Sequence, residues 1–133
     1  MACLLRARGA EFDVEAYLAG SPFAEASSYR GGDPTVGAGR RQTAGFTLAV
    51  GPARGGDLDS QVEQAVEFLD QHEDELRRLG RYPGVEEVEL DFGIAWREGS
   101  SQTDLFPPEL LWRAGALDIA LRVTHYLTQQ QES

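Results

Sequence analysis

Three carboxylates alternate along one predicted strand and are the first candidates for chemistry. Glu87, Glu89 and Asp91 occupy every second position of the segment VEEVELDFGIAW, so they share one face of an extended chain. Neighbours on such a face lie ~7 Å apart, a separation at which two carboxyl groups can act as general acid and general base. That chemistry needs one carboxyl group whose pKa is raised by burial in an apolar pocket, and the sequence supplies no such pocket. We therefore expect a solvent-exposed acidic face, which Arg6 and Arg8 would neutralise if the first strand lay beside it.

The same acidic residues are candidates for binding a basic partner protein. Asp118 occupies an outward position of the last predicted strand and joins Glu87, Glu89 and Asp91 in this candidate set. The chain has 22 acidic and 12 basic residues, for a formal net charge of −10. Long-range attraction by such a charge speeds the capture of a basic protein, as in toxin-neutralising immunity proteins. The same charge argues against binding to nucleic acid or to an anionic membrane.

A glycine-rich segment with three arginines is a candidate anion site. Arg30, Arg40 and Arg41 flank or end the segment GGDPTVGAGRR, and backbone N–H groups in such loops can hold phosphate. The segment lacks the G-K-[ST] of a Walker loop, and it leads into a strand instead of a helix. We expect a hairpin loop, and an anion site on it as the alternative.

Neither histidine belongs to a recognisable catalytic or metal-binding motif. His72 and His125 lack the paired spacing of a zinc site, and we expect packed or rim positions for both. Cys3 is the only cysteine, falls on the inward face of the first strand, and is expected to be a buried, inert thiol. These residues predict no metal and no cofactor, and they argue against an enzyme. Trp96 and Trp112 both fit core positions, with room for partial exposure of their indole N–H groups.

Periodicity and turn residues predict a sequence of short elements. Asp13 is a suitable N-cap, and Phe12 can pack on Tyr17 one turn into the helix that follows. Ser60 begins a capping-box pattern with Glu63, and an apolar stripe then continues at helical spacing. The predicted elements are a strand at 1–8, a helix from Asp13 to Gly20, strands near 23–30 and at 44–50, one long helix from Ser60 to Gly80, a strand at 85–96, a helix at 107–114 and a strand at 117–126.

This order predicts an α+β fold. The first six elements follow the β-α-β-β-α-β pattern of the split, ferredoxin-like arrangement, and an α-β unit is added at the C-terminal end. We expect a two-layer sandwich with a mostly antiparallel sheet and helices on one face. The expected organisation is one domain over residues 1–127, with a frayed polar tail at 128–133.

Several phrases of the sequence together carry a family resemblance. They are FDVEAYLAGSP, GGDP, QVEQAVEFLDQHEDELRRL, YPGVEEVELDFGIA and FPPELLWRAGALDIALRVTHY. The chain resembles, over nearly its whole length, a family of short bacterial proteins catalogued as a domain of unknown function. The loop GGDPTVGAGRR and the segment after Tyr126 fit the pattern least well. The resemblance implies a stand-alone protein and carries over no catalytic residues.

The sequence favours a non-catalytic protein-binding domain over an enzyme or ligand-binding domain. The alternative would use the 31–41 loop and the edge of the sheet for an anion or another ligand. The single cysteine, the early charges in MACLLRARG and the lack of a long apolar run predict a cytoplasmic protein. The chain is expected to be a monomer or a homodimer formed through edge strands or helices, because like-charged acidic faces would repel one another.

Overall fold

The fold combines one sheet with a layer of helices. The structure is a computed structural model that describes residues 2–23, 25–34, 39–51, 57–96 and 101–127, so the expected tail at 128–133 lies outside the described residues. The elements are β1 (Cys3–Gly9), α1 (Val14–Ala19), β2 (Ser27–Tyr29), β3 (Ala44–Ala49), α2 (Leu58–Gln71), α3 (Glu73–Arg81), β4 (Glu87–Trp96), α4 (Pro108–Ala116) and β5 (Ala120–Leu127). The α+β class and the two-layer arrangement predicted from the sequence are confirmed.

The sheet has the strand order β2-β3-β1-β4-β5. Every neighbouring pair is antiparallel except β4 and β5, which are parallel and are connected through α4. In each β-α-β unit of the core a third strand separates the two strands: β3 lies between β1 and β2, and β1 lies between β3 and β4. This is the split arrangement expected from the element order.

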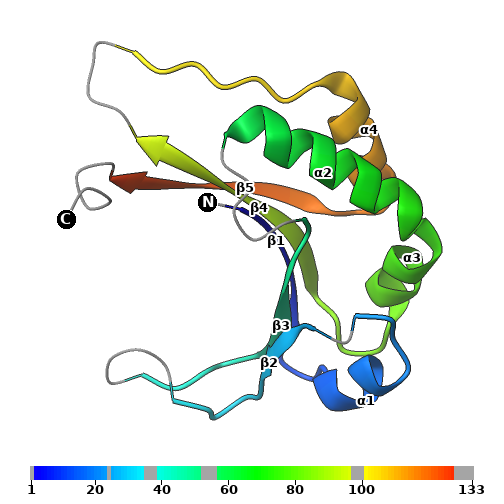
Figure 1. Cartoon of the computed structure of the whole chain (residues 1–133). Coiled ribbons are helices and arrows are strands. Elements are labelled where there is room, and N and C mark those ends of the chain that lie inside the picture. Colours follow the sequence, from blue (N-terminus) through cyan, green and yellow to red (C-terminus); the bar gives the residue numbers. More distant parts are fainter. Residues whose placement is uncertain (1, 24, 35–38, 52–56, 97–100, 128–133) are drawn as a thin grey trace.

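The helices cover one face of the sheet, and the opposite face is open (Figure 1). Along β1, Cys3, Leu5 and Ala7 are buried beneath the helices, whereas Leu4, Arg6 and Arg8 alternate with them on the open face. The helices contribute the other half of one continuous core. Its helical members include Val14, Tyr17, Val62, Ala65, Phe68, Leu69, Leu76, Leu79, Leu110 and Ala114.

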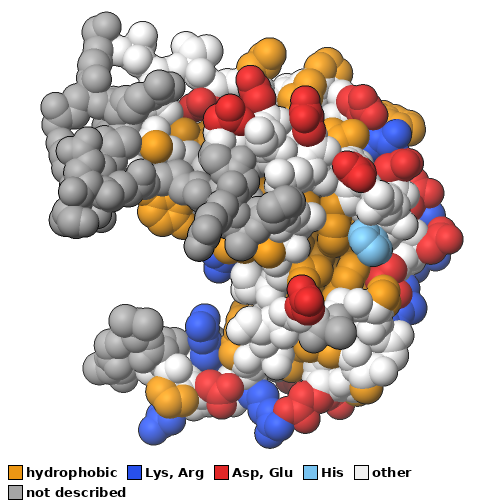
Figure 2. Space-filling model, in the orientation of Figure 1, with side chains coloured by type: hydrophobic (Ala, Val, Ile, Leu, Met, Phe, Trp, Pro, Cys, Tyr) orange, Lys and Arg blue, Asp and Glu red, His pale blue; other side chains and the backbone are white. Residues whose placement is uncertain are grey.

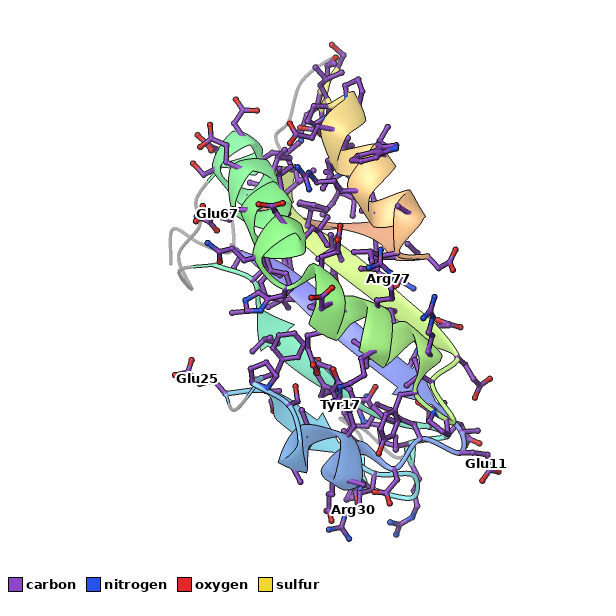
Figure 3. All side chains as sticks on the ribbon, turned by 90° about the vertical axis from the view of Figure 1, so that its right-hand side faces the viewer. Glu11, Tyr17, Glu25, Arg30, Glu67 and Arg77 are labelled. Carbon is purple, nitrogen blue, oxygen red and sulfur yellow. The ribbon has the colours of Figure 1, made fainter. Side chains whose placement is uncertain are left out.

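The first helix begins as its capping residues predict. The Asp13 side chain accepts a hydrogen bond from the backbone N–H of Ala16, and the rings of Phe12 and Tyr17 lie 6.0 Å apart. Tyr17 projects from α1 toward α3 (Figure 3), where its hydroxyl donates to Glu75. This contact joins the first helix to the third.

The predicted long helix is instead two helices. The break occurs at His72, whose backbone (φ −113°, ψ 24°) caps α2 at its C-terminal end and α3 at its N-terminal end. The predicted N-cap at Ser60 is also wrong, because α2 begins at Leu58, two residues before it. Asp57 is the cap, and its side chain accepts a hydrogen bond from the Ser60 N–H at 2.8 Å.

A buried glutamine attaches α2 to the sheet. Gln61 is fully buried; its side-chain nitrogen donates to the Gly93 carbonyl at 2.7 Å, and its oxygen accepts from the Gly93 N–H at 3.0 Å. The pairing of β4 with β1 ends at Phe92, so the side chain bonds the first β4 residue beyond that ladder. Both backbone groups of Gly93 are thereby satisfied inside the protein.

The chain reverses at a close backbone contact between two glycines. Gly84 has a φ of +90°, in the left-handed region that favours glycine. Its carbonyl oxygen would lie 1.8 Å from a β-carbon added at Gly9, so a side chain at Gly9 would displace the turn before β4. No helix in the described part of the chain has the length and apolar character needed to cross a bilayer.

Candidate functional site

Charged and polar side chains of β1, β4 and β5 interact on the open face of the sheet. We call this group the sheet-face network; its members are Arg6, Arg8, Glu87, Glu89, Asp91, Arg122 and Thr124. Glu89 is central to it, with Arg8 Nη1 at 2.9 Å from one carboxylate oxygen and Arg122 Nε at 2.9 Å from the other. Arg8 also pairs with Glu87. One carboxylate of β4 is therefore held from both sides by arginines of the two neighbouring strands.

The second half of the network is centred on Asp91, which follows Glu89 on the same face of β4. Arg6 Nη2 is 3.2 Å from the Asp91 carboxylate, and Thr124 Oγ1 donates to Asp91 at 2.7 Å. Thr124 belongs to β5 and Arg6 to β1, so Asp91, like Glu89, has partners from both neighbouring strands. The pairing of Arg6 and Arg8 with these acids, expected from the sequence, is confirmed.

Exposure to solvent differs from the sequence expectation for two of the three carboxylates. Glu89 and Asp91 are each 5% exposed, whereas the Glu87 side chain is 59% exposed. The expectation of an exposed acidic face is wrong for Glu89 and Asp91. They point to the open side of the sheet, but arginine side chains from β1 and β5 lie over them.

The electrostatic state of Glu89 does not suit a general acid. Burial by itself would raise its pKa, but hydrogen bonds from Arg8 and Arg122 and the positive charges of both outweigh burial, so the pKa lies below its ordinary value. Glu89 therefore stays ionised at neutral pH. A carboxyl group that acts as a general acid at this pH needs a raised pKa instead.

The fourth candidate acid lies apart from the network. Asp118 is exposed and has a φ of 57°, and its N–H donates to the Gly115 carbonyl. It belongs to the turn after α4, because β5 begins only at Ala120. There it borders a pocket of about 170 Å³ together with Arg81 and Glu86.

The three loop arginines each have a different partner. Arg30 pairs with Glu15 of α1, Arg40 donates to the Gly32 carbonyl at 3.1 Å, and the Arg41 guanidinium lies 4.2 Å from the centre of the Tyr29 ring. The predicted hairpin between β2 and β3 is confirmed, although residues 35–38 of its loop lie outside the described residues. The structure does not gather these three arginines around one shared partner.

The histidines and the cysteine occupy separate places. His72 is half-buried, with its ring 5.5 Å from that of Phe23 and 4.7 Å from that of Phe68, whereas His125 is exposed on β5. Cys3 is fully buried, and burial together with the charge of Asp91 raises the pKa of its thiol to about 12. In the described parts of the chain, no group of His, Cys, Asp and Glu side chains could hold a metal ion.

An acidic surface that the sequence reasoning did not single out runs along α2. Four exposed residues at helical spacing form this surface, which we call the acidic stripe: Asp59, Glu63, Glu67 and Asp70. Asp70 pairs with Arg113 of α4 at 3.1 Å. In the described ranges no arginine forms an ion pair with the other three. Figure 2 shows acidic side chains gathered over α2 and α4.

A groove with an apolar floor lies beside the acidic stripe, between α2 and the start of α4. It has a volume of about 360 Å³. Its lining consists of Val62, Glu63, Val66, Glu67, Asp70, Pro107, Glu109 and Arg113. The spacing of the acids along residues 59–70 was the available sequence signal for this surface, but the groove itself requires α4 to pack beside α2.

A larger pocket lies on the other side of α2. It has a volume of about 520 Å³ and is bordered by the end of β3, by α2 and by the segment between α1 and β2. We call it the Phe23–Phe68 pocket; its lining is Pro22, Phe23, Glu25, Leu48, Ala49, Val50, Gly51, Gln64, Glu67, Phe68, Gln71 and His72. Glu67 therefore borders both the groove and this pocket.

Comparison with known proteins finds no relative of this chain. No protein-family model, no curated protein and no solved structure matches the chain. The resemblance to a bacterial family of unknown function therefore stays a prediction from the sequence.

Proposed function

We propose that this chain is a non-catalytic protein-binding domain that captures a basic protein in the bacterial cytoplasm, as a toxin-neutralising immunity protein would. The observation that carries the proposal is the acidic stripe on α2. Its carboxylates face solvent, and Asp59, Glu63 and Glu67 have no arginine partner in the described part of the chain. Charges of this kind attract an oppositely charged partner over distances of several ångströms beyond contact.

The groove between α2 and α4 gives the same surface a means of specific contact. Val66 and Pro107 are half-buried and supply apolar surface, and the carboxylates of the stripe border it. A lysine or arginine side chain can place its aliphatic part on such a floor and its charge beside the acids. This combination of a charged rim and an apolar centre is typical of protein interfaces.

The sheet-face network is the weaker candidate for this role, although its acids were expected to form the binding face. Glu89 and Asp91 are already neutralised by Arg8, Arg122 and Arg6. A basic partner would have to displace these arginines before it could pair with the carboxylates.

The test compares two variants of equal net charge. In the stripe variant, Asp59→Asn, Glu63→Gln and Glu67→Gln remove three negative charges from α2. In the control variant, Glu11→Gln, Asp74→Asn and Asp104→Asn remove three exposed charges from other surfaces. Each protein is immobilised and exposed to an extract of the native host, and bound proteins are quantified at low and at high salt.

We expect the wild type and the control variant to retain the same basic partner in stoichiometric amounts at low salt, and high salt to release it. The stripe variant should lose most of this binding. If no stoichiometric partner is retained, or if both variants lose it equally, the proposal is wrong.

A further inference from the structure

We infer that the outer edge of β5 pairs with β5 of a second copy of this chain, antiparallel and about a two-fold axis at Thr124, so that two sheets join into one. The edge strand and the outer flank of α4 lie apart from the acidic stripe, so this pairing goes beyond the proposed function. Three features of the edge support it: the direction of its backbone groups, the lack of protection against strand pairing, and the side chains that flank it.

The pairing of the sheet fixes which backbone groups of each strand point where. The Val50 N–H donates to the Cys3 carbonyl at 3.0 Å, so odd-numbered residues of β1 direct their backbone groups to β3 and even-numbered ones to β4. Arg6 pairs with Glu89, so odd-numbered residues of β4 face β1 and even-numbered ones face β5. Gly93 fits this assignment, because it lies beyond the end of the β1 ladder and both of its backbone groups bond a side chain of α2 instead.

Leu121 and Val123 therefore present their N–H and C=O groups at the outer edge of β5. In a parallel pair, only one of two residues in register directs its backbone groups to the other strand. Leu90 and Phe92 of β4 do so, and their register partners are Leu121 and Val123. The backbone groups of these two β5 residues point away from the sheet.

This edge lacks the features that usually prevent strand pairing. β2, at the other edge of the sheet, has three residues, whereas β5 has eight. β5 contains no proline and no lysine, and its one formally charged side chain, Arg122, pairs with Glu89 on the open face. Among the described residues, no strand lies beyond β5. An edge of this length, ~26 Å, is a template for another strand.

Apolar side chains of α4 and β5 flank the edge. α4 lies beside α2 in the helical layer (Figure 1), and Arg113 faces α2, where it pairs with Asp70. Leu111, two positions earlier on the helix, lies on the opposite flank, toward the outer side of β5, and is 51% exposed. On the same face of the sheet, Leu121 and Val123 are only half-buried. A second copy would cover these side chains.

The order of side chains along β5 fits a second copy of the same strand. Because the outward groups belong to odd-numbered residues, an antiparallel pair joins odd to odd, and the two-fold axis passes through a residue. An axis at Arg122 would oppose two arginines, and an axis at Val123 would place Arg122 opposite Thr124. With the axis at Thr124, each Arg122 lies opposite Tyr126 of the second copy, whose ring is exposed. An arginine beside an aromatic ring and a threonine beside a threonine are favourable cross-strand pairs.

The area of the edge limits the strength of this association. A strand of eight residues with a helix layered on it presents an edge of roughly 26 by 20 Å, so about 1,000 Å² would be buried in the two copies together. Such an area is at the lower limit of a specific interface. Each copy has a formal charge of −10, and the two repel one another. We expect a dissociation constant in the micromolar range and a tighter dimer at high salt, which screens the repulsion.

The first test measures mass by light scattering after size-exclusion chromatography, at loading concentrations from about 1 μM to about 1 mM. The mass should rise from 14.6 kDa toward twice that value, and about 1 M salt should shift the rise to lower concentration. Val123→Pro should keep the mass of one chain throughout. The N–H that proline lacks points outward at this position, so the change removes a bond to the second copy and none to β4. Circular dichroism checks that this variant is folded.

The second test locates the axis by disulfide formation. Thr124→Cys places two thiols opposite each other in a non-hydrogen-bonded pair, where the Cα atoms lie ~4.5 Å apart and a disulfide can form. Ser28→Cys is the matched control, because Ser28 is exposed on the other edge strand; the native Cys3 is buried in both variants. Under mild oxidation we expect Thr124→Cys to cross-link at least about tenfold faster than Ser28→Cys.

Three results would overturn the inference: a wild type that keeps the mass of one chain at the highest concentration and salt, a folded Val123→Pro that still forms the dimer, or a Thr124→Cys that cross-links no faster than Ser28→Cys. If the edge receives a strand of another protein instead, the first of these results follows. High salt strengthens this dimer but releases the basic partner of the acidic stripe, so each proposal can fail while the other stands.

Discussion

Replacement of Glu89 by glutamine tests whether the sheet-face network stabilises the fold through one buried carboxylate. Glutamine keeps the size and one oxygen of the side chain but removes its charge. A hydrogen bond to a charged group contributes about 1.5–3 kcal/mol, whereas an exposed pair contributes about 0–1 kcal/mol. The side chain of Glu89 is 6% exposed, that of Arg8 26% and that of Arg122 53%. We therefore assign the hydrogen bond from Arg8 the free energy of a shielded charged bond, and the bond from Arg122 the smaller free energy of an exposed pair. We therefore expect Glu89→Gln to lower the free energy of unfolding by about 2 kcal/mol.

The measurement is urea unfolding at neutral pH, with Glu87→Gln as the matched control. Glu87 lies on the same strand face and pairs with Arg8, but its side chain is 59% exposed, so its loss should cost about 0.5 kcal/mol or less. If the free energy of unfolding depends on urea concentration with the same slope in all three proteins, the shifts of the unfolding midpoint give the two differences in free energy directly. The reasoning is refuted if Glu89→Gln stays within about 0.5 kcal/mol of the wild type, or if Glu87→Gln is the more damaging change.

The pH dependence of the stability difference between the wild type and Glu89→Gln is a second test of the same reasoning. The pKa of Glu89 is lowered in the folded state, so its ionised form stabilises the fold above the ordinary pKa of an unfolded glutamate, about 4.3. This stabilisation is lost as the pH falls through the lower, folded-state pKa. The stability gap between wild type and Glu89→Gln should therefore narrow as the pH is lowered from neutrality to about 3. A gap that is constant with pH would show that the change acts through packing and not through charge.

Two further substitutions and one labelling experiment test other parts of the structure. Gln61→Leu should lower the free energy of unfolding by about 2–4 kcal/mol in urea, because both backbone groups of Gly93 lose their partner inside the protein; a loss under about 1 kcal/mol would contradict the assigned hydrogen bonds. Tyr17→Phe should cost about 1 kcal/mol in thermal unfolding, since it removes the hydroxyl that donates to Glu75, and an unchanged midpoint would speak against that bond. A thiol reagent should modify Cys3 rapidly only in denaturant, because the thiol is fully buried and its pKa is raised to about 12; fast modification of the native protein would place Cys3 at the surface.

The strands were predictable because their side chains alternate between two different environments. Val88, Leu90 and Phe92 are buried beneath the helices, as the alternation of β4 indicates. The pairing of β1 with β4 also followed, since arginines on one strand suit acids on the other. The burial of Glu89 could not be predicted in the same way, because it also depends on Arg122 from a strand that pairs in parallel through a crossover.

The helical errors have local causes. Asp57 and Ser60 are both good N-caps, and a local pattern does not decide between two such residues three positions apart. The local signal of a break at His72 is weak: the acids at 73–75 suit the first turn of a new helix, but they equally suit the exposed face of a continuing one. Periodicity continues through the break, so the apolar stripe alone predicted one long helix.

The candidate site was only partly visible in the sequence. Asp118 is in phase with the outward residues of the last strand, but its positive φ places it in a turn, where phase along a strand has no meaning. Trp112 was expected to fit the core and is 71% exposed on α4. The two hollows beside α2 depend on how helices and loops pack, and composition or spacing does not specify that packing.

The sheet-face network also decides where the electric charge of the molecule resides. Arg6, Arg8 and Arg122 cancel the charges of Glu87, Glu89 and Asp91, so the whole formal charge of −10 belongs to the rest of the chain. Because the exposed carboxylates of α2 lie in the helical layer, negative charge is concentrated on the side of the molecule away from the neutralised sheet face. Near a cationic surface, the attraction of these carboxylates favours an approach with α2 leading.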